Sequence, residues 1–570
     1  MKLLRLFLVV LFGAAVSYAN SDEVMIYEAP LTLSTYRIGE PEIMPHWAAR
    51  FARIYPYTML DKLTEEKYDR TYNACWLENE YVKVLVLPEI GGRVHGAQDK
   101  TNGYQFMFDQ RVIKPALVGL TGAWISGGIE WNFPDGHRQS CFRPADWRLV
   151  ENHDGSRTVW TGEIERVYGM RWSVGTTVHP GRNWVECKVR LFNCTPYPHS
   201  FLYWGNCGVR GTPEFQLITP GEIATGHGKH AFYRWPVHKG VDLRFWKNAP
   251  GGTSYFVENS KDNFYGCYSP EHRGGMVHWA DHQTVPGKKI WFCGTSPAGR
   301  LWEKVLTDGD LPLVEIQIGA YSDNQPDYHW LMPGETKVFS HFWFPVREIG
   351  VWDYANLEGT LKLKLKQGKV KLGWSPTGRN EGALVILTSE GKEFFRRTVD
   401  ADPATPLVAE IKAPEGADCY SLKMTVLSAA GDTLLSYQRP EPTNPPLPEG
   451  KPPVPEPGEV ESLEKLFLIG DRVEKFREQN RGLAYYREAL RRDPEDVRSN
   501  TAVGVVLLKQ GQFDKSLEHF EKALERDPSF ARAWYYGGLA NIGLKKEKEA
   551  ENYLNRSGYD PAYYAAAHFE

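Results

Sequence analysis

A six-residue motif near the end of the chain recurs after 34 residues, and no other sequence feature limits the possible folds as strongly. Residues 489–494 read ALRRDP and residues 523–528 read ALERDP. A repeat of this length is typical of stacked helical hairpins, in which each unit buries its apolar face only against its neighbours. Residues 459–570 are therefore predicted to form an α-helical solenoid.

The residues around the second copy of the motif include the small and apolar side chains that let two antiparallel helices approach closely. They are Asn500, Val503, Gly504, Leu507, Ser516, Phe520, Ala523 and Pro528. This pattern resembles the tetratricopeptide repeat family, and about three units fit the sequence. Because stacked hairpins present a concave groove, the resemblance implies a protein or peptide partner. Self-association, or packing against the rest of the chain, is the alternative.

The first residues have the composition of a secretory signal. Lys2 and Arg5 precede an apolar run over 6–16, and a small-residue cleavage site ends at Ala19. The apolar run is shorter than the roughly 20 residues that cross a bilayer. Residues 1–19 are therefore predicted to be a signal peptide. The mature protein is expected to be exported to the periplasm or the extracellular space, with no membrane span after signal removal.

Length, charge and cysteine spacing exclude several classes of protein. A chain of 570 residues is too long for one hydrophobic core, so about two to four domains are expected. The formal net charge is −4 and no basic run occurs, so neither nucleic acid nor an anionic membrane surface is an expected partner. The eight cysteines form no CxxC pair, and neither a metal nor a cofactor is expected.

Aromatic residues separate the first part of the chain from the rest, because seventeen of the nineteen tryptophans lie at or before Trp352. Over the same part, short alternating runs such as 81–86 and 188–192 are separated by Gly, Pro and Asn. This arrangement is typical of antiparallel strands. A domain of this size must bury two faces of its strands, which favours stacked sheets. Residues 20–350 are therefore predicted to be one large β-sandwich.

Two further segments follow the large β-domain. Residues 351–438 contain a hairpin at 361–372 whose apolar and cationic side chains alternate, and the strand spacing predicts an immunoglobulin-like β-sandwich. This domain is interpreted as a spacer rather than a sugar-binding module, because it has few aromatic residues. Residues 439–458 are rich in proline, which predicts an extended linker that lets the helical repeats move independently.

A loop over residues 126–138, SGGIEWNFPDGHR, gathers many of the chemically capable side chains of the large β-domain. Aromatic rings pack against the apolar face of a pyranose, while acid, amide, imidazole and guanidinium groups hydrogen-bond to its hydroxyls. The loop is therefore predicted to belong to a sugar site, with Glu130 and His137 as catalytic residues. The residues predicted to bind substrate are Trp131, Asn132 and Arg138. The alternative is that Glu130 and Arg138 form an ion pair that stabilises a long loop.

A second segment, residues 313–325, carries an acid and an amide on one side of an otherwise apolar strand. These are Glu315 and Gln317, two residues apart. An acid in such a strand is costly unless it is paired or used. The segment resembles the strand of galactose mutarotases and aldose 1-epimerases that bears the catalytic Glu in a Glu-x-Gln setting.

Other short motifs resemble the same superfamily. Residues 333–336 (PGET), followed by 342–345 (FWFP), resemble its closing turn and final strand, and residues 90–94 (IGGRV) resemble an early strand. The resemblance covers roughly residues 45 to 350 and implies a mutarotase-like antiparallel β-supersandwich. It also implies that Glu315 is the general base that takes the anomeric hydroxyl proton, that Gln317 fixes the sugar, and that Arg93 lies at the substrate end.

The proton donor is the point at which this sequence differs from that family. In the family a histidine protonates the ring oxygen, whereas the matching region here, residues 201–208, has Asn206 in the corresponding place. An amide is not a proton donor of tunable pKa. The acid is then expected from a neighbouring loop, as His137, His199 or His227. Asn206 and His227, which glycines flank, are predicted to contact the sugar.

The predicted function is therefore the binding and conversion of a saccharide by an exported, multidomain protein that is mainly β, with helical repeats at its C-terminus. An epimerase that uses Glu315 as its base is the first hypothesis. The alternatives are a glycoside hydrolase that uses Glu130 and Glu315, and a non-catalytic sugar-binding protein whose repeats recruit a partner. A carboxylate separation of about 5–5.5 Å is typical of a retaining hydrolase, and about 6.5–9.5 Å of an inverting one.

Overall fold

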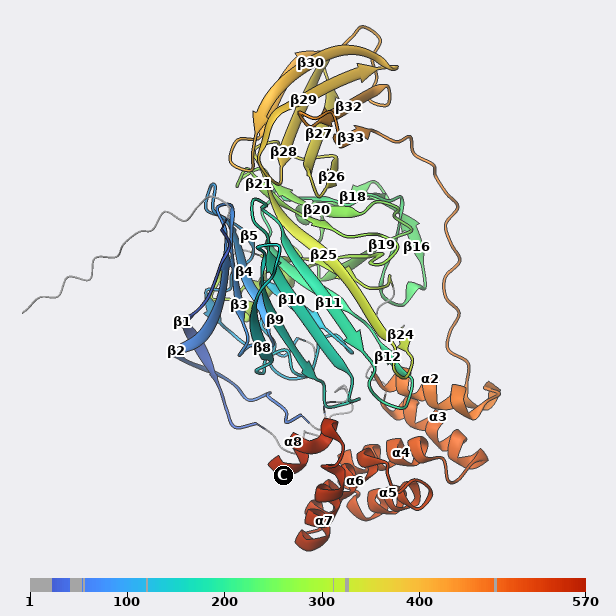
Figure 1. Ribbon diagram of the computed structural model, residues 1–570. Coiled ribbons are helices and arrows are strands. Elements are labelled where there is room, and N and C mark those ends of the chain that lie inside the picture. Colours follow the sequence, from blue (N-terminus) through green and yellow to red (C-terminus); the bar gives the residue numbers. More distant parts are fainter. Residues whose placement is uncertain are drawn as a thin grey trace, which may run out of the picture.

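The computed structural model describes residues 23–41, 54, 57–118, 121–310, 312–322, 328–475 and 479–570. The predicted fold class is confirmed: the protein is mainly β, and its long helices follow the strands (Figure 1). The predicted signal peptide, residues 1–19, lies outside the described residues. Within these ranges, no helix combines the length and the apolar character needed to cross a bilayer. All eight cysteines are described, and each is a free thiol.

Two stacked sheets, almost entirely antiparallel, form the large β-domain. The larger sheet runs in the order β16 (Phe232–Arg234), β15 (Ile223–Thr225), β19 (Thr253–Glu258), β22 (Gly287–Phe292), β23 (Leu313–Gly319), β13 (Trp204–Arg210), β7 (Ile129–Asn132), β4 (Arg93–Asp99), β3 (Val82–Leu87), β2 (Leu63–Glu78), β1 (Met25–Ile38) and β6 (Val112–Ile113), with β5 (Tyr104–Met107) paired to β4. The smaller sheet runs in the order β14 (Gln216–Ile218), β20 (Phe264–Ser269), β21 (Gly274–Trp279), β25 (Thr336–Arg347), β11 (Val185–Phe192), β10 (Arg171–Val178), β9 (Arg157–Ile164) and β8 (Asp146–Glu151).

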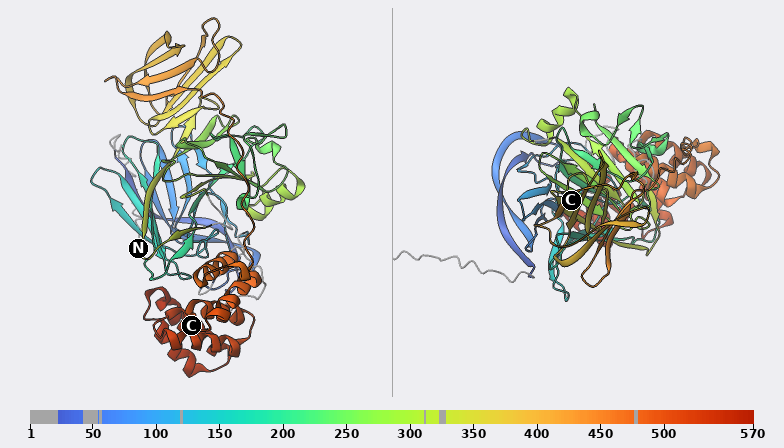
Figure 2. Two further views of the ribbon diagram at one scale, coloured as in Figure 1. Left: turned by 90° about the vertical axis from the view of Figure 1, so that its right-hand side faces the viewer. Right: turned by 90° about the horizontal axis from the view of Figure 1, so that it is seen from above.

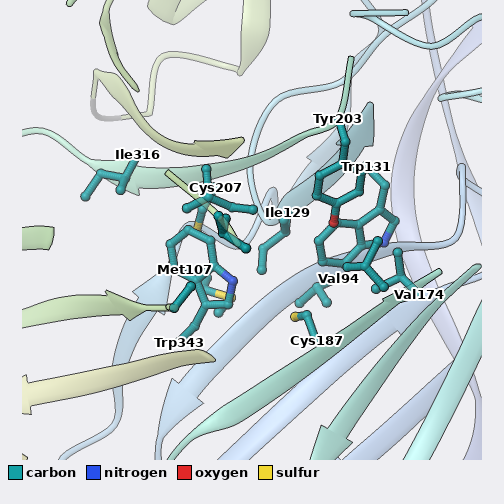
Figure 3. Close-up of a cluster of buried hydrophobic side chains, with 14 of the residues drawn as sticks. Val94, Met107, Ile129, Trp131, Val174, Cys187, Tyr203, Cys207, Ile316 and Trp343 are labelled. Atoms are coloured by element: carbon teal, nitrogen blue, oxygen red, sulfur yellow. The ribbon is translucent and has the colours of Figure 1, made fainter. Parts of the chain in front are cut away.

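The core of this domain lies between the two sheets. Alternating side chains of both sheets meet there, and Figure 3 shows Ile129 and Ile316 from the larger sheet with Val174 and Trp343 from the smaller one. Burial of each such side chain stabilises the fold by about 1.5–3 kcal/mol. Because successive residues of a strand point to opposite faces, the residues next to these core positions project from the other face of the larger sheet. The candidate site is built on that outer face.

Short elements surround the two sheets. They are β12 (His199–Phe201) paired with β24 (His329–Leu331), β17 (Val237–His238) paired with β18 (Val241–Asp242), the 3₁₀ helices η1 (His227–Lys229) and η2 (Trp246–Asn248), and helix α1 (Pro297–Leu306). Helix α1 begins after Ser296, whose side chain accepts a hydrogen bond from the Gly299 N–H at 3.2 Å. Serine at this position satisfies one of the unpaired donors at a helix start.

A smaller sandwich follows, formed from two four-stranded sheets. Its strands are β26 (Tyr354–Asn356), β27 (Gly359–Lys366), β28 (Lys369–Pro376) and β31 (Leu407–Lys412), packed against β30 (Lys392–Ala401), β29 (Asn380–Ser389), β32 (Leu422–Leu427) and β33 (Thr433–Gln438). The alternation in β27 places Leu361 and Leu363 in the core and leaves its lysines outside. Figure 2 shows this sandwich and the helical arm at opposite ends of the large β-domain.

The helical arm consists of antiparallel hairpins. After the 3₁₀ helix η3 (Pro457–Glu459), its helices are α2 (Leu463–Lys475), α3 (Gln479–Arg492), α4 (Val497–Lys509), α5 (Phe513–Arg526), α6 (Ala531–Gly543), α7 (Glu547–Ser557) and α8 (Pro561–Phe569). Gly504 of α4 packs directly on Phe520 of α5, since a Cβ at Gly504 would come 2.5 Å from that ring. A small residue is required wherever two helices lie this close.

The proline-rich linker is attached to the large β-domain, which corrects the prediction of independent motion. The Glu222 carboxylate accepts hydrogen bonds from the backbone N–H groups of Thr443 and Asn444, at 2.8 and 2.7 Å. Further along, the Lys451 N–H donates to the Lys229 carbonyl at 3.0 Å. Figure 1 shows the linker passing along the side of the domain. The prediction rested on amino-acid composition, which gives no information about such backbone contacts.

The inner side of the helical arm faces the large β-domain. Residues of α2, α4, α6 and α8 line a cavity of about 290 Å³ together with the β-domain segment 194–199. The Tyr197 ring lies 5.6 Å from the Phe530 ring, and its hydroxyl donates to Asp527 at 3.5 Å. Of the alternatives for the arm, packing against the rest of the chain is therefore observed in this structure.

Candidate active site

Strand register brings polar residues from distant parts of the sequence into one row across the larger sheet. Asn206 on β13 is paired with Glu130 on β7 and with Gln317 on β23. Gln317 is paired in turn with Lys289 on β22. On the other side, the pairing of Val94 with Ile129 places Arg93 next to Glu130. Residues that are directly opposite each other in antiparallel strands project from the same face, so these five side chains share the outer face.

Glu315 lies on the same face, one step along its strand from this row. It is paired with Gly208 and Trp291, so the glycine adds no side chain beside the carboxylate. Two strand spacings and a two-residue step separate Glu315 from Glu130, which places their Cα atoms roughly 12 Å apart. The two acids predicted as a catalytic pair therefore lie on one face of one sheet, with Asn206 between their strands.

Glu130 is held by a histidine and two amides. The His137 Nδ1 lies 2.7 Å from Oε2 and 3.0 Å from Oε1, and the side-chain amides of Asn132 and Asn206 donate to Oε2 at 3.2 and 3.3 Å. Burial alone would raise the pKa of Glu130, but His137 and the charge of Arg93 lower it to about 2. The loop ion pair weighed as an alternative is corrected: the partner of Glu130 is His137 and not Arg138.

Glu315 has the opposite electrostatic environment. Burial raises its pKa, and the charge of Glu130 raises it further, against the lowering effect of His137, Lys289 and the Gln317 amide that donates to it. The two carboxyl groups are thus displaced in opposite directions from their ordinary values. Such displacement of neighbouring acids is typical of sites that carry out acid–base chemistry.

Lys289 is a member of this group that sequence reasoning missed. Its Nζ lies 5.2 Å from the Phe256 ring centroid and 5.8 Å from that of Trp204. Burial lowers its pKa to about 8, although Glu315 and Glu130 act to raise it. The only sequence signal was the alternation in β22, where Lys289 and Trp291 occupy one face and Ile290 the other.

Two buried acceptors in the row have no partner in the described part of the chain. They are Oδ1 of Asn206 and Oε1 of Gln317, which belong to directly paired residues. Leaving a buried acceptor unsatisfied costs about 1–3 kcal/mol. The amide nitrogens of the same residues donate to Glu130 and Glu315, so the acids orient both side chains.

Two predicted substrate-binding residues lie in the core instead, which corrects their assignment. Trp131 is only 1% exposed, donates from Nε1 to the Gly92 carbonyl at 3.0 Å, and points between the sheets (Figure 3). Arg138 is equally buried, with its guanidinium 4.0 Å from the Trp172 ring centroid. The prediction failed because residues 129–132 were assigned to a loop. They form strand β7, in which Trp131 must point away from Glu130.

Arg93 and Asn132 form hydrogen bonds with protein groups around Glu130. The Arg93 guanidinium donates to the Ile125 carbonyl at 2.8 Å and to the Gly127 carbonyl, so it holds the loop that precedes β7. Asn132 donates to Glu130 and accepts from the Arg138 N–H at 3.1 Å. Both are buried, and their contact with a ligand stays a prediction.

Of the three candidate histidines, His137 is the one whose described contacts include an acid of the row. His137 contacts Glu130, and 19% of its side chain is exposed. His227, on η1, lies 5.0 Å from the Phe256 ring and so borders the Lys289 end of the row. His199 lies in the cavity lined by the helical arm. The structure therefore brings together Glu130, His137, Asn206, Glu315 and Gln317, and leaves His227 at the border.

Sequence comparison assigns the large β-domain to a family. The profile of a domain of unknown function (DUF5107) matches residues 49–346, just over half of the chain. The chain belongs to the DUF5107 family. The rest of this DUF5107 protein matches two other profiles, the second domain of YphG-like proteins over residues 354–437 and the tetratricopeptide repeat over residues 502–530.

Solved structures share this architecture. A tetratricopeptide-repeat-domain protein from Parabacteroides distasonis covers 94% of the DUF5107 protein and 80% of its own chain, at 19% identity and a TM-score of 0.56. Over about half the chain the structural neighbours are mutarotase-like. One of them, a galactose mutarotase-like protein from Lactobacillus casei, covers 48% of this chain and 100% of its own, at 11% identity and a TM-score of 0.35. At 19% identity, the likeness to the Parabacteroides distasonis protein shows the fold alone.

Curated relatives match in a short segment. The Hsp70-Hsp90 organizing protein of Triticum aestivum is 32% identical over 91 residues, which are 15% of this chain and 16% of that protein. The DUF5107 protein thus spans about one sixth of the length of this curated relative. Together with the repeat profile, the match identifies the arm as tetratricopeptide-like.

Proposed function

We propose that this DUF5107 protein is a carbohydrate-acting enzyme that interconverts the anomers of an aldose. Glu315 is its general base, and His137, oriented by Glu130, is its proton donor. The observation that supports this assignment is the placement of the Glu130–His137 pair and Glu315 on one polar face, with the pKa values of the two acids shifted in opposite directions.

The proposed reaction needs one base and one acid. Glu315 takes the proton of the anomeric hydroxyl, the bond from the anomeric carbon to the ring oxygen breaks as the aldehyde C=O forms, and the His137 imidazolium gives its proton to the ring oxygen. After rotation of the aldehyde, the same transfers run backwards and close the ring on its other face, so both residues regain their starting states. A raised pKa makes Glu315 a stronger base. Because Glu130 contacts Nδ1 of His137, the other ring nitrogen, Nε2, is the one that transfers a proton to the substrate.

The neighbouring residues supply recognition. Sugar hydroxyls are donors that the unpartnered oxygens of Asn206 and Gln317 can accept from. Lys289 and Glu315 are diagonal neighbours on adjacent strands, with Cα atoms about 8 Å apart. The long Lys289 side chain can therefore reach a ligand that Glu315 holds. The Trp291 ring beside Glu315 offers an aromatic face to a pyranose.

Anomer exchange measured by NMR tests this proposal. Wild-type protein is expected to transfer magnetisation between the two anomers of a cognate aldose faster than buffer does. Glu315→Gln and His137→Asn are each expected to lower this rate at least about 100-fold, the usual scale of general acid–base catalysis. Glu271→Gln, which removes an exposed carboxylate from a turn of the same domain, serves as control. Wild-type rates equal to buffer over a broad panel of aldoses would reject the isomerase assignment.

Hydrolysis of a glycoside is a second candidate, which the split between the two acids supports. A carboxylate of low pKa beside one of raised pKa is the pattern of a glycosidase pair, with Glu315 as the acid and Glu130 as the base or nucleophile. Against this role, Glu130 already accepts hydrogen bonds from Asn132, Asn206 and His137. Release of reducing sugar from oligosaccharides, lost in Glu130→Gln, would favour hydrolysis. Sugar binding without either reaction would favour a binding protein.

The location and the partner are parts of the same proposal. The basic, apolar and small-residue order of residues 1–19 supports export to the periplasm or the extracellular space. The helical arm supports binding of a protein or peptide, although its inner side contacts the β-domain here. Such a partner would bind elsewhere on the arm or displace segment 194–199.

A further inference from the structure

A second candidate binding surface lies on the opposite side of the large β-domain. Strands β8 to β11 of the smaller sheet present a groove of about 550 Å³ on the face that points away from the core. Its lining includes Arg148, Trp160, Arg171 and Arg190. The groove belongs to the other sheet from Glu315, so a function for it is independent of the proposed reaction.

Trp160 covers the floor of this groove. It is paired with Gly175 on β10, and a Cβ at Gly175 would come 2.9 Å from the indole. The ring therefore lies over the glycine, close to the sheet. Neighbouring positions on the outer face are also small, since Gly162 is paired with Ser173. A flat aromatic face in a shallow groove suits the apolar face of a pyranose.

Three arginines line the groove together with the indole. Arg148, Arg171 and Arg190 are exposed, and among the described residues no carboxylate forms an ion pair with any of them. The Arg190 guanidinium lies over the Trp160 ring, 5.0 Å from its centroid, so a sugar that stacks on the ring takes the place of this side chain. Of the acids in the lining, Glu163 accepts from the Trp172 indole at 3.1 Å and lies 3.7 Å from Arg138, and Asp146 lies on the edge strand β8. The groove thus has a local excess of positive charge, although the chain as a whole is acidic.

We propose that this groove binds an acidic polysaccharide, a chain of pyranose units that carry carboxylate or sulfate groups. Trp160 stacks on one sugar ring, and Arg148, Arg171 and Arg190 bind acidic groups on neighbouring units. Guanidinium groups match carboxylate and sulfate oxygens in paired hydrogen bonds. Arg171 also lines the cavity beside the helical arm, so the bound chain is directed toward the arm.

Affinity electrophoresis tests this inference with full-length protein. Gels that contain polygalacturonate are expected to retard the wild type more at 50 mM than at 200 mM salt, because exposed charges are screened. Gels that contain neutral dextran are expected to have no effect. The double variant Arg171→Gln/Arg190→Gln and the variant Trp160→Ala are each expected to bind at least about tenfold more weakly. Arg379→Gln, an exposed arginine of the smaller sandwich, removes one charge elsewhere and should leave retardation unchanged.

Several results would overturn the proposal. These are no retardation of wild type by polygalacturonate or heparin, equal retardation by dextran, equal retardation by single-stranded DNA, and variants that bind as tightly as wild type. Thermal unfolding shows whether each variant is folded. Because Trp160 is half-buried, Gly175→Val provides a second change that displaces the ring without removing it, and it is expected to weaken binding as well. Polysaccharide binding is measured without anomer exchange, so a failure of one proposal is distinguishable from a failure of the other.

Discussion

Replacing Glu130 by glutamine should remove a specific pH dependence of stability. The amide has the shape of a protonated carboxyl group, so the variant mimics a Glu130 that is never ionised. In the folded protein the pKa of Glu130 is lowered from its ordinary 4.5 to about 2, because His137 and Arg93 outweigh the effect of burial. That lowering corresponds to about 3 kcal/mol of stabilisation by the ionised form.

The direction of the effect follows from the two pKa values. Above pH 4.5 the carboxylate is ionised in both the folded and the unfolded chain, and the full stabilisation is present. As pH falls from 4.5 toward 2, the unfolded chain binds its proton first, so the contribution of Glu130 is lost progressively. Glu130→Gln is therefore expected to be about 3 kcal/mol less stable than wild type at pH 6, with a difference near zero at pH 2.

Urea unfolding at a series of pH values measures this difference. Near-UV circular dichroism reports on the large β-domain, because most of the tryptophans belong to it. Glu271→Gln, the exposed control, should track wild type at every pH. A difference between wild type and Glu130→Gln that stays constant from pH 6 to pH 2 would refute the electrostatic account of the Glu130–His137 pair. So would a variant that is as stable as wild type at pH 6.

Three further predictions concern other parts of the molecule. If the Lys289 ammonium binds the substrate, anomer exchange should decline above pH about 8, the value to which burial lowers its pKa, and Lys289→Arg, which stays charged, should abolish that decline. Gly504→Val should destabilise the helical arm by about 1–3 kcal/mol through overpacking against Phe520, as an earlier arm transition in calorimetry with unchanged exchange rates. Tyr197→Ala should weaken the packing of the arm on the β-domain and speed proteolysis in the linker. Unchanged cleavage would indicate that the linker contacts at Glu222 are sufficient to hold the arm in place.

Much of the candidate site could be predicted because its signals are local. Glu315 and Gln317 alternate with apolar residues, so their common side of one strand is a property of the segment itself. Glu130 and His137 are close enough in sequence to belong to one strand and the loop after it. By contrast, Trp131 was assigned to the ligand because the segment was interpreted as a loop. A four-residue strand between turns leaves too short a pattern to reveal which face each side chain occupies.

Sequence alone determined the features that repeat along the chain: the 34-residue period of the helical arm and the alternation that makes the rest of the protein β. These depend on the backbone geometry of near neighbours, which is the same in any fold. Only the tertiary structure decided that Lys289, Gln317, Asn206 and Glu130 form one row, and that the arm packs on segment 194–199. Register between strands far apart in sequence is set by how whole sheets pack, and no local pattern encodes it.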